Sequence, residues 1–151
     1  MNMQKMFNNA MKARRAETML NSEQLTLGEF ILKLEAIKNK NLFVVFDDPK
    51  YYPLGFDSWR GNYDELMLEY ESGISKTLCK DLLKKAIETK GRTFSGYKGG
   101  DYIMGKSTPI WVAQYGDSSG FKTTEEIYTQ AVIDITETDN NVVIVTKNIE
   151  F

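Results

Sequence analysis

Apolar residues recur at helical spacing in two stretches of the chain. In residues 26–37, TLGEFILKLEAI, they return every three or four positions, and Thr26 and Glu29 have the spacing of a capping box. Residues 77–90, TLCKDLLKKAIETK, repeat this pattern, and Gly91 follows as a helix stop. The sequence therefore predicts an amphipathic helix in each stretch.

The first 22 residues predict a further helix that extends from the domain. Its apolar stripe is rich in methionine and consists of Met3, Met6, Phe7, Ala10 and Met11. A core of this size offers few partners for such a stripe. We therefore expect residues 1–22 to form a contact between copies of the chain in a homo-oligomer.

Shorter stretches have the composition of strands. LFVVF, residues 42–46, is a continuous apolar run and predicts a buried central strand. LMLEYE, DYIMG and PIWVAQY predict further short strands. Residues 47–65 contain two prolines, two glycines and several aromatic residues, and we expect them to form a long loop of functional importance.

The end of the chain predicts a hairpin. Residues 130–138 and 141–150 alternate between apolar and polar positions on either side of a polar turn. In the first of these strands, Ala131, Ile133 and Ile135 are expected on the buried face.

The helices and strands alternate without the regular spacing of βαβ units. This order predicts an α+β fold, with a mainly antiparallel sheet packed by two or three amphipathic helices. The 151 residues suffice for a single domain, residues 1–151, around one core.

Composition narrows the classes of function. The 19 Lys and Arg residues against 21 Asp and Glu give a net charge of −2, which argues against general DNA binding because phosphate neutralisation requires a cationic excess. No apolar run approaches the roughly 18–20 residues of a membrane span, and the first residues lack the apolar core of a signal peptide. We therefore expect no membrane association and a cytoplasmic location.

The chain contains no histidine and one cysteine. The first absence removes the commonest general base, the usual catalytic triads and most zinc sites. The second rules out a thiolate metal cluster. The sequence therefore assigns no catalytic residue, metal or cofactor, and a binding protein is favoured over an enzyme.

One segment combines glycines, lysines and aromatic rings, as a ligand site would. Residues 96–116 read GYKGGDYIMGKSTPIWVAQYG. Aromatic rings can stack on a base, while lysines and backbone amides at glycines can hold phosphate. The GKST within it is not a phosphate-binding loop, because Pro109 and the β-forming run behind it forbid the required helix. The candidate ligand residues here are Tyr97, Lys98, Gly99, Gly100, Tyr102, Lys106 and Trp111.

A second candidate wall comes from the loop expected at residues 47–65. Trp59 and Tyr63 supply rings, and Arg60 has the planar fork that suits phosphate or carboxylate. The alternative is a surface turn in which Arg60 forms a salt bridge at the rim, with Asp57 or Asp64 as its partner. For the first segment, the alternative is a hairpin whose tyrosines and tryptophan pack in the core. The sequence leaves both alternatives open.

Both segments carry a resemblance to a family. SWRGNYDELMLE, residues 58–69, resembles the Ser-Tyr-Arg-Gly-x-Tyr-x-x-Leu-x-x-Glu segment of small proteins common in phages and actinobacteria. Residues 92–120 are similar to their Thr-Phe-x-Gly-Tyr/Trp-Lys-Gly-Gly-x-Tyr-x-Met segment, which continues through Thr-Pro-x-Trp-Val-Ala-x-Tyr-Gly. The resemblance implies a phage or phage-like origin, hence the host cytoplasm, and no assigned activity.

Residue types and context together give a hypothesis of function. A phage-encoded, non-enzymatic binding protein would sequester a nucleotide-derived signal of host immunity, by analogy with small phage proteins of that kind. The alternative is a protein that inhibits a host defence enzyme by docking its aromatic loops. A third hypothesis is a hydrolase or transferase that uses Asp47, Asp48 or Asp101. The sequence specifies neither the ligand nor the host target.

Overall fold

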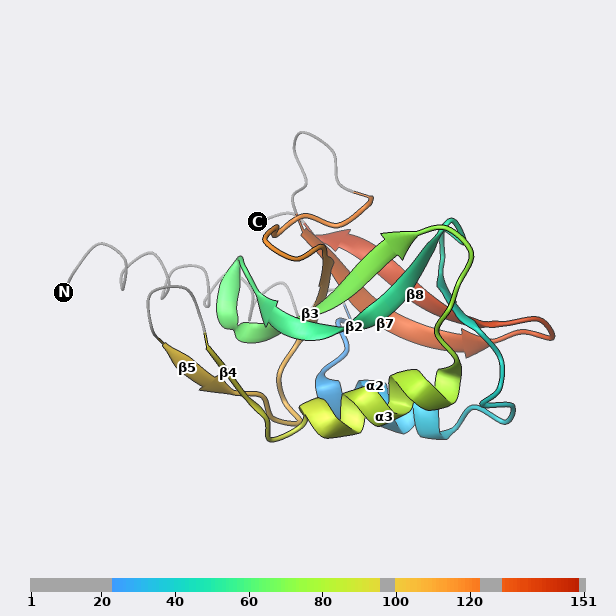
Figure 1. Ribbon diagram of the computed structural model, residues 1–151, viewed down its shortest axis with the longest axis horizontal. Helices are drawn as coiled ribbons and strands as arrows, with labels where there is room; N and C mark the ends of the chain where they lie inside the picture. The colour runs from blue at the N-terminus through green and yellow to red at the C-terminus, as the bar shows by residue number, and fades with distance from the viewer. Residues whose placement is uncertain (1–22, 96–99, 123–128, 150–151) are drawn as a thin grey trace.

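A computed structural model describes residues 23–95, 100–122 and 129–149 of the chain (Figure 1). The expected helix and subunit contact of residues 1–22 lie outside the described residues. Within them, the protein is mostly β, with two helices, α2 and α3.

Six strands form one curved sheet. Its order is β1-β8-β7-β6-β3-β2, with parallel pairing between β1 and β8 and between β3 and β6, and antiparallel pairing elsewhere. The two end strands, β1 and β2, contact one another, so the sheet is nearly closed and barrel-like. The strands are β1 (Val44–Phe46), β2 (Tyr51–Trp59), β3 (Asn62–Ser72), β6 (Ile110–Ala113), β7 (Thr129–Glu137) and β8 (Val142–Ile149). The expected α+β fold, a mainly antiparallel sheet packed by two or three helices, is therefore wrong: strands predominate among the described residues, and the sheet is mixed and nearly closed.

The expected loop at residues 47–65 is instead most of a hairpin. β2 and β3 pair antiparallel, and Arg60 and Gly61 form the turn between them. Pro53 is tolerated because β2 has a paired neighbour on one side only, and a register shift beside it accommodates Gly55. Proline and glycine thus mark an edge strand with a bulge here rather than a loop.

β1 corrects a second expectation. All three of its residues are buried, as the apolar run predicts, but the strand lies at the end of the sheet order and pairs only with β8. β1 is buried because the sheet nearly closes and because the helices cover it. A local apolar pattern reports this burial but cannot show whether the strand is central or terminal in the sheet.

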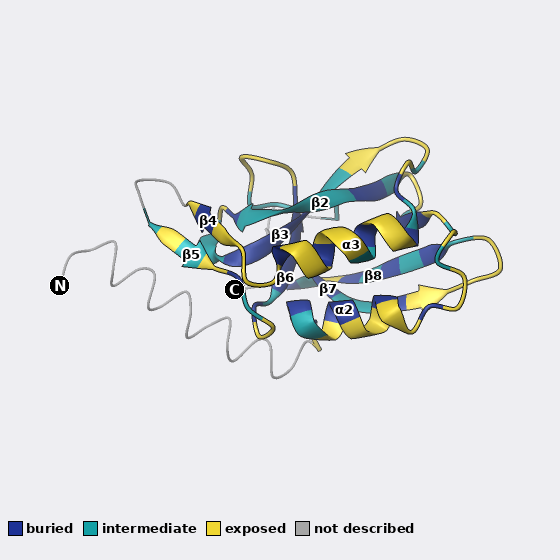
Figure 2. Cartoon of the chain, turned by 60° about the horizontal axis from the view of Figure 1, so that its bottom comes forward, coloured by how far each residue is buried: buried dark blue, intermediate teal, exposed yellow. Residues whose placement is uncertain are grey.

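The two helices lie side by side across one face of the sheet (Figure 2). They are α2 (Leu27–Glu35) and α3 (Cys79–Thr89), as the periodicity predicts, and each turns its apolar stripe toward the sheet. Gly91 ends α3 at φ +85°, which confirms it as the helix stop. A separate pair of short strands, β4 (Thr93–Ser95) and β5 (Asp101–Ile103), follows.

The capping box of α2 is present and gives a test of local stability. The Glu29 amide donates to the Thr26 hydroxyl over 3.4 Å, and the Thr26 amide donates to the Glu29 carboxylate over 3.0 Å. Thr26→Ala is expected to lower the free energy of unfolding by about 1 kcal/mol in urea denaturation. Glu29→Gln keeps an oxygen that can accept the Thr26 amide, so it should lower the free energy of unfolding less than Thr26→Ala does. An equal loss would show that the negative charge of Glu29, rather than the hydrogen bond, stabilises the helix start.

The sheet buries apolar residues on both faces. The larger cluster lies under the helices, whereas the smaller one consists of Trp59, Met67, Trp111, Ala113, Ala131 and Ile149. On β7 a register shift between Val132 and Asp134 reverses which side chains point to which face of the sheet. Ala131 therefore belongs to the smaller cluster and Ile135 to the larger one. The expected strict alternation of Ala131, Ile133 and Ile135 is therefore wrong.

Candidate functional site

The two tryptophans expected in a ligand wall lie in the interior. Trp59 and Trp111 are fully buried and stacked, with ring centroids 4.5 Å apart and planes 17° apart. The Trp59 Nε1 donates to the Ser118 carbonyl over 3.3 Å, and the Trp111 Nε1 donates to Glu65 Oε1 over 2.8 Å. Neither indole has an exposed face on which a base could stack.

The close fit of this pair also fixes the hairpin turn beside it. A Cβ at Gly61 would lie 2.4 Å from the Trp59 ring, which no real contact allows. The glycine is therefore needed for the ring to fold under the turn, and this fold in turn places Arg60 on the outside.

Arg60 and Tyr63 lie together in one hollow of about 470 Å³, which we call the Arg60 hollow. Its walls come from the β2–β3 hairpin, from the end of β4 and from the loop after β6. The residues that line it are Asp57, Ser58, Arg60, Tyr63, Ser95, Tyr115 and Gly116. Two of them, Arg60 and Tyr63, are among the candidates from the sequence.

The polar groups of the Arg60 hollow are partly engaged. The Arg60 guanidinium donates to the Gly116 carbonyl, and the Ser58 hydroxyl donates to the Tyr63 carbonyl. Asp57 Oδ1 accepts the Ser58 amide over 2.7 Å. Arg60 is exposed and Tyr115 is 79% exposed, so a guanidinium and a phenol ring both face solvent at this place.

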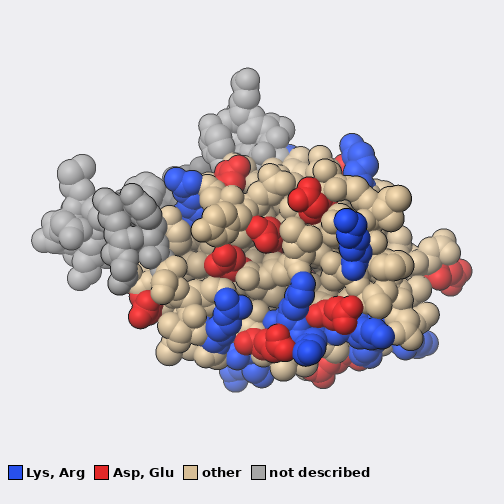
Figure 3. Space-filling view, viewed as in Figure 1, with Lys and Arg blue, Asp and Glu red and all other residues tan. Residues whose placement is uncertain are grey.

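The face drawn in Figure 3 shows no broad basic patch among its described residues. On this face, Lys and Arg side chains are interspersed with acidic ones along the lower edge, over α3.

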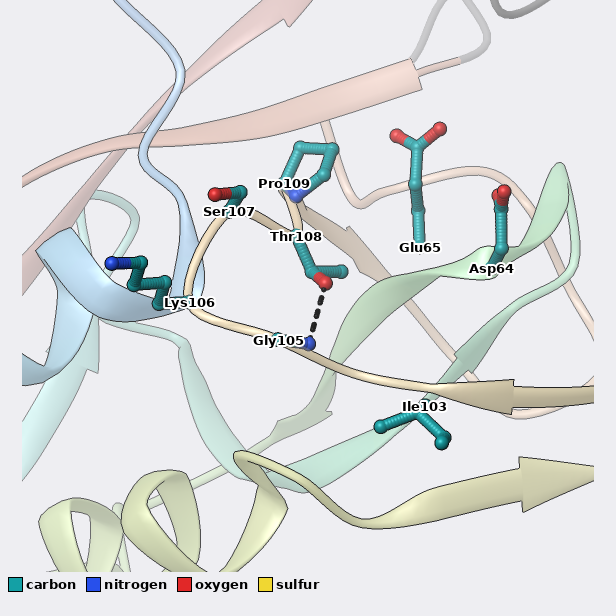
Figure 4. A pocket seen from close by; sticks show the side chains of 8 residues that line it. All are labelled: Asp64, Glu65, Ile103, Gly105, Lys106, Ser107, Thr108 and Pro109. Atoms are coloured by element: carbon teal, nitrogen blue, oxygen red, sulfur yellow. Dashed lines mark hydrogen bonds between the residues drawn. The ribbon is translucent and has the colours of Figure 1, made fainter.

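Lys106 lines a different hollow, of about 510 Å³, which also contains Asp64 and Glu65 (Figure 4). In this view the Lys106 side chain points toward α2 and away from the two acidic residues. The Thr108 hydroxyl closes the turn by accepting the Gly105 amide over 3.0 Å. The charged groups of this hollow do not converge on a common point.

Residues 100–107 have the full spacing of a phosphate-binding loop, Gly-x-x-x-x-Gly-Lys-Ser. The structure excludes that function, because strand β6 follows the segment where the motif needs a helix. The amides of Leu27 and Gly28, at the start of α2, donate to the Thr108 and Lys106 carbonyls over 2.8 Å each. The nearest helix start is therefore closed to an anion.

The remaining candidates of residues 96–116 divide into two groups. Tyr97, Lys98 and Gly99 lie outside the described residues. Tyr102 is half-buried and packs against the larger apolar cluster, and a Cβ at Gly100 would lie 2.6 Å from its hydroxyl. Gly100 therefore serves a close approach to a tyrosine of the same chain.

A polar network that the sequence did not indicate ties the loop after β6 to the sheet. The Lys122 ammonium contacts Asp47 Oδ2 at 2.6 Å, and the Thr146 amide donates to the same oxygen over 2.9 Å. The Thr146 hydroxyl donates to Asp47 Oδ1 over 2.8 Å and accepts from the Gln130 amide group over 2.7 Å. Both oxygens of Asp47 are thus occupied by structural partners.

Aromatic contacts hold the same loop further. Phe121 stacks on Tyr51 at 4.3 Å and meets the edges of Phe46 and Tyr70. Burial raises the pKa of the Tyr70 phenol, and the nearby Asp117 carboxylate raises it further. Tyr70 therefore stays a neutral phenol near pH 7. The loop after β6, which carries Tyr115, is held at Phe121 by these three rings.

Comparison with known proteins adds no relative. No protein-family model matches the chain, and no curated protein or solved structure matches it. Among the described residues, no group of three or more acidic or cysteine side chains could hold a metal ion, and no helix has the length and apolar character to cross a membrane.

Proposed function

We propose that this protein binds a small, anionic, nucleotide-derived ligand in the Arg60 hollow and retains it without turnover. The observation that carries the proposal is the convergence of an exposed guanidinium, two tyrosines and two serines on one hollow of about 470 Å³. That volume lies within the range of about 300–1,000 Å³ typical of small-molecule sites.

Each group suits one part of such a ligand. The guanidinium fork of Arg60 can donate two parallel hydrogen bonds to a phosphate. The hydroxyls of Ser58 and Ser95 donate to the Tyr63 carbonyl and to Asp101, so each can still accept a hydrogen bond from a sugar hydroxyl. The rings of Tyr63 and Tyr115 offer apolar faces to a base, a contact that is worth about 1–3 kcal/mol per base in single-stranded nucleic-acid sites.

The contacts of Asp47, Asp48 and Asp101 support binding of the ligand without its hydrolysis. Both oxygens of Asp47 are held by the network described above. Asp48 pairs with Lys50 at 3.6 Å, and Asp101 accepts the Ser95 hydroxyl over 3.1 Å. Each of the three carboxylates therefore already has a partner within the chain.

The biological role extends this proposal. The resemblance of residues 58–69 and 92–120 to phage proteins supports an anti-defence role, in which the protein withdraws a nucleotide signal of host immunity in the host cytoplasm. The second candidate is a protein inhibitor of a host defence enzyme, which the 79% exposed Tyr115 would favour as an anchor.

Arg60→Ala tests the proposal. We expect it to weaken binding of a responsive nucleotide by about 1.5–3 kcal/mol, the worth of a hydrogen bond to a charged group, and to leave the melting temperature nearly unchanged because Arg60 is exposed. Calorimetric titration with ADP-ribose derivatives and cyclic dinucleotides measures the affinity.

The exposed Lys147 lies outside the hollow, so Lys147→Ala serves as the matched control and should leave the affinity unchanged. If the wild-type protein binds none of these nucleotides, the proposal is wrong. A complex with a host protein, isolated from defence-activated cells, would then favour the inhibitor.

A further inference from the structure

We infer that the Arg60 hollow selects a ligand with one phosphate group beside a free vicinal diol, as in a ribose 5-phosphate, and that Asp57 recognises the diol. This inference rests on the proposed function and narrows it. It favours nucleoside monophosphates, which carry a single phosphate, over cyclic dinucleotides.

The charges of the hollow favour a ligand with a single phosphate group. Among the described residues that line it, Arg60 is the one cation and Asp57 the one anion, and no ion pair joins these two. A cyclic dinucleotide brings two phosphodiesters, and the second would lie near Asp57, where no described lysine or arginine lines the hollow to neutralise it. A single phosphate at Arg60 avoids that repulsion.

The chemistry of Asp57 carries the second step. An ionised carboxylate only accepts hydrogen bonds, so the part of the ligand that lies against it must donate. Its Oδ1 already accepts the Ser58 amide at 2.7 Å, which fixes the orientation of the group, and no described donor occupies Oδ2. Two neighbouring hydroxyls are the donors that a ribose presents, and they match the spacing of the two carboxylate oxygens.

The position of Asp57 in the fold makes it a specific acceptor. It lies on β2 opposite Met67 of β3, three residues before Arg60. Its backbone is therefore held by the sheet, whereas a loop residue would have to be ordered on binding. The acceptor thus lies on a paired strand, and the cation follows it in the adjoining turn.

A guanine base is the competing source of donors for a carboxylate, and the choice of nucleotides separates the two. AMP and GMP carry both a phosphate and a diol. Their 2′-deoxy forms lack one hydroxyl, and 3′,5′-cyclic AMP has no free vicinal diol. Each is titrated into the wild-type protein, into Asp57→Asn and into Asp48→Asn, the same change of group at a site outside the hollow.

We expect the wild-type protein to bind AMP about tenfold or more tightly than 2′-deoxy-AMP or cyclic AMP, because a hydrogen bond to a charged group is worth at least that factor. Asp57→Asn should lose this preference by weakening AMP alone, and Asp48→Asn should retain it. The ratio of AMP to 2′-deoxy-AMP in the wild-type protein needs no variant, so it stands even if Asp57→Asn folds poorly.

Three results would overturn the inference. Equal affinity for AMP and 2′-deoxy-AMP would show that no diol is recognised. A preference for GMP over AMP that ignores the sugar would assign Asp57 to a base. A diol preference that survives in a folded Asp57→Asn would assign it to another residue. Failure of every nucleotide to bind, ADP-ribose included, would instead remove the proposed function, and this inference with it.

Discussion

Asp47→Ala is expected to lower the free energy of unfolding by about 3 kcal/mol, the lower end of the range for breaking a buried ion pair. The carboxylate accepts the Thr146 amide and hydroxyl and pairs with Lys122 at 2.6 Å. Its side chain is 19% exposed and that of Lys122 34%, so the ammonium left behind is only partly rehydrated. Urea denaturation followed by circular dichroism measures the loss.

The Lys33–Asp134 pair is the matched control for this experiment. Its atoms lie 3.0 Å apart, but the two side chains are 43% and 45% exposed, and an exposed pair contributes about 0–1 kcal/mol. Asp134→Ala should therefore cost far less than Asp47→Ala. Equal losses from the two variants would contradict this prediction. They would show that neither the burial of Asp47 nor its hydrogen bonds to Thr146 add to stability.

Local pattern sufficed for the elements whose contacts are local. The helix at residues 26–37 and the final hairpin follow from periodicity and turn residues, because each periodicity reports which side of one element is buried. The parallel pairings of β1 with β8 and of β3 with β6 join segments far apart in the sequence. No local pattern encodes them, and they determine the mixed, nearly closed sheet.

The candidate site was predictable only in part, for the same reason. Arg60 and Tyr63 belong to one hairpin, so a single sequence segment contains both. Ser95 and Tyr115 reach the Arg60 hollow through tertiary contacts. Asp57 was visible in the sequence as a polar neighbour of Arg60, but only as its salt-bridge partner, and the structure forms no such pair.

The wrong prediction of a loop at residues 47–65 also led to a wrong prediction for Trp59. Once residues 47–65 are taken as a loop, Trp59 is expected at the surface. On a strand that ends in a register shift between Ser58 and Trp59, the ring instead enters the smaller apolar cluster. Trp111 comes from a different segment and meets Trp59 there through the parallel pairing of β3 and β6, in which Trp111 lies opposite Met67.

Trp111→Ala is expected to lower the free energy of unfolding by about 3–5 kcal/mol, the cost of removing a fully buried large aromatic side chain. The change also removes the indole that donates to Glu65 Oε1 over 2.8 Å and the stacking partner of Trp59. Trp111→Phe keeps a ring but loses the donor and part of the buried volume, so its loss should be smaller than that of Trp111→Ala. Denaturation of the two variants measures both losses.

The intrinsic fluorescence of the wild-type protein checks the burial on which this prediction rests. Two fully buried indoles should emit at short wavelength and resist quenching by iodide. Because neither ring has a face toward solvent, a nucleotide in the Arg60 hollow should change their emission far less than direct stacking would. Ready quenching by iodide, together with a loss below about 1 kcal/mol in Trp111→Ala, would place the ring at the surface and return it to the ligand wall.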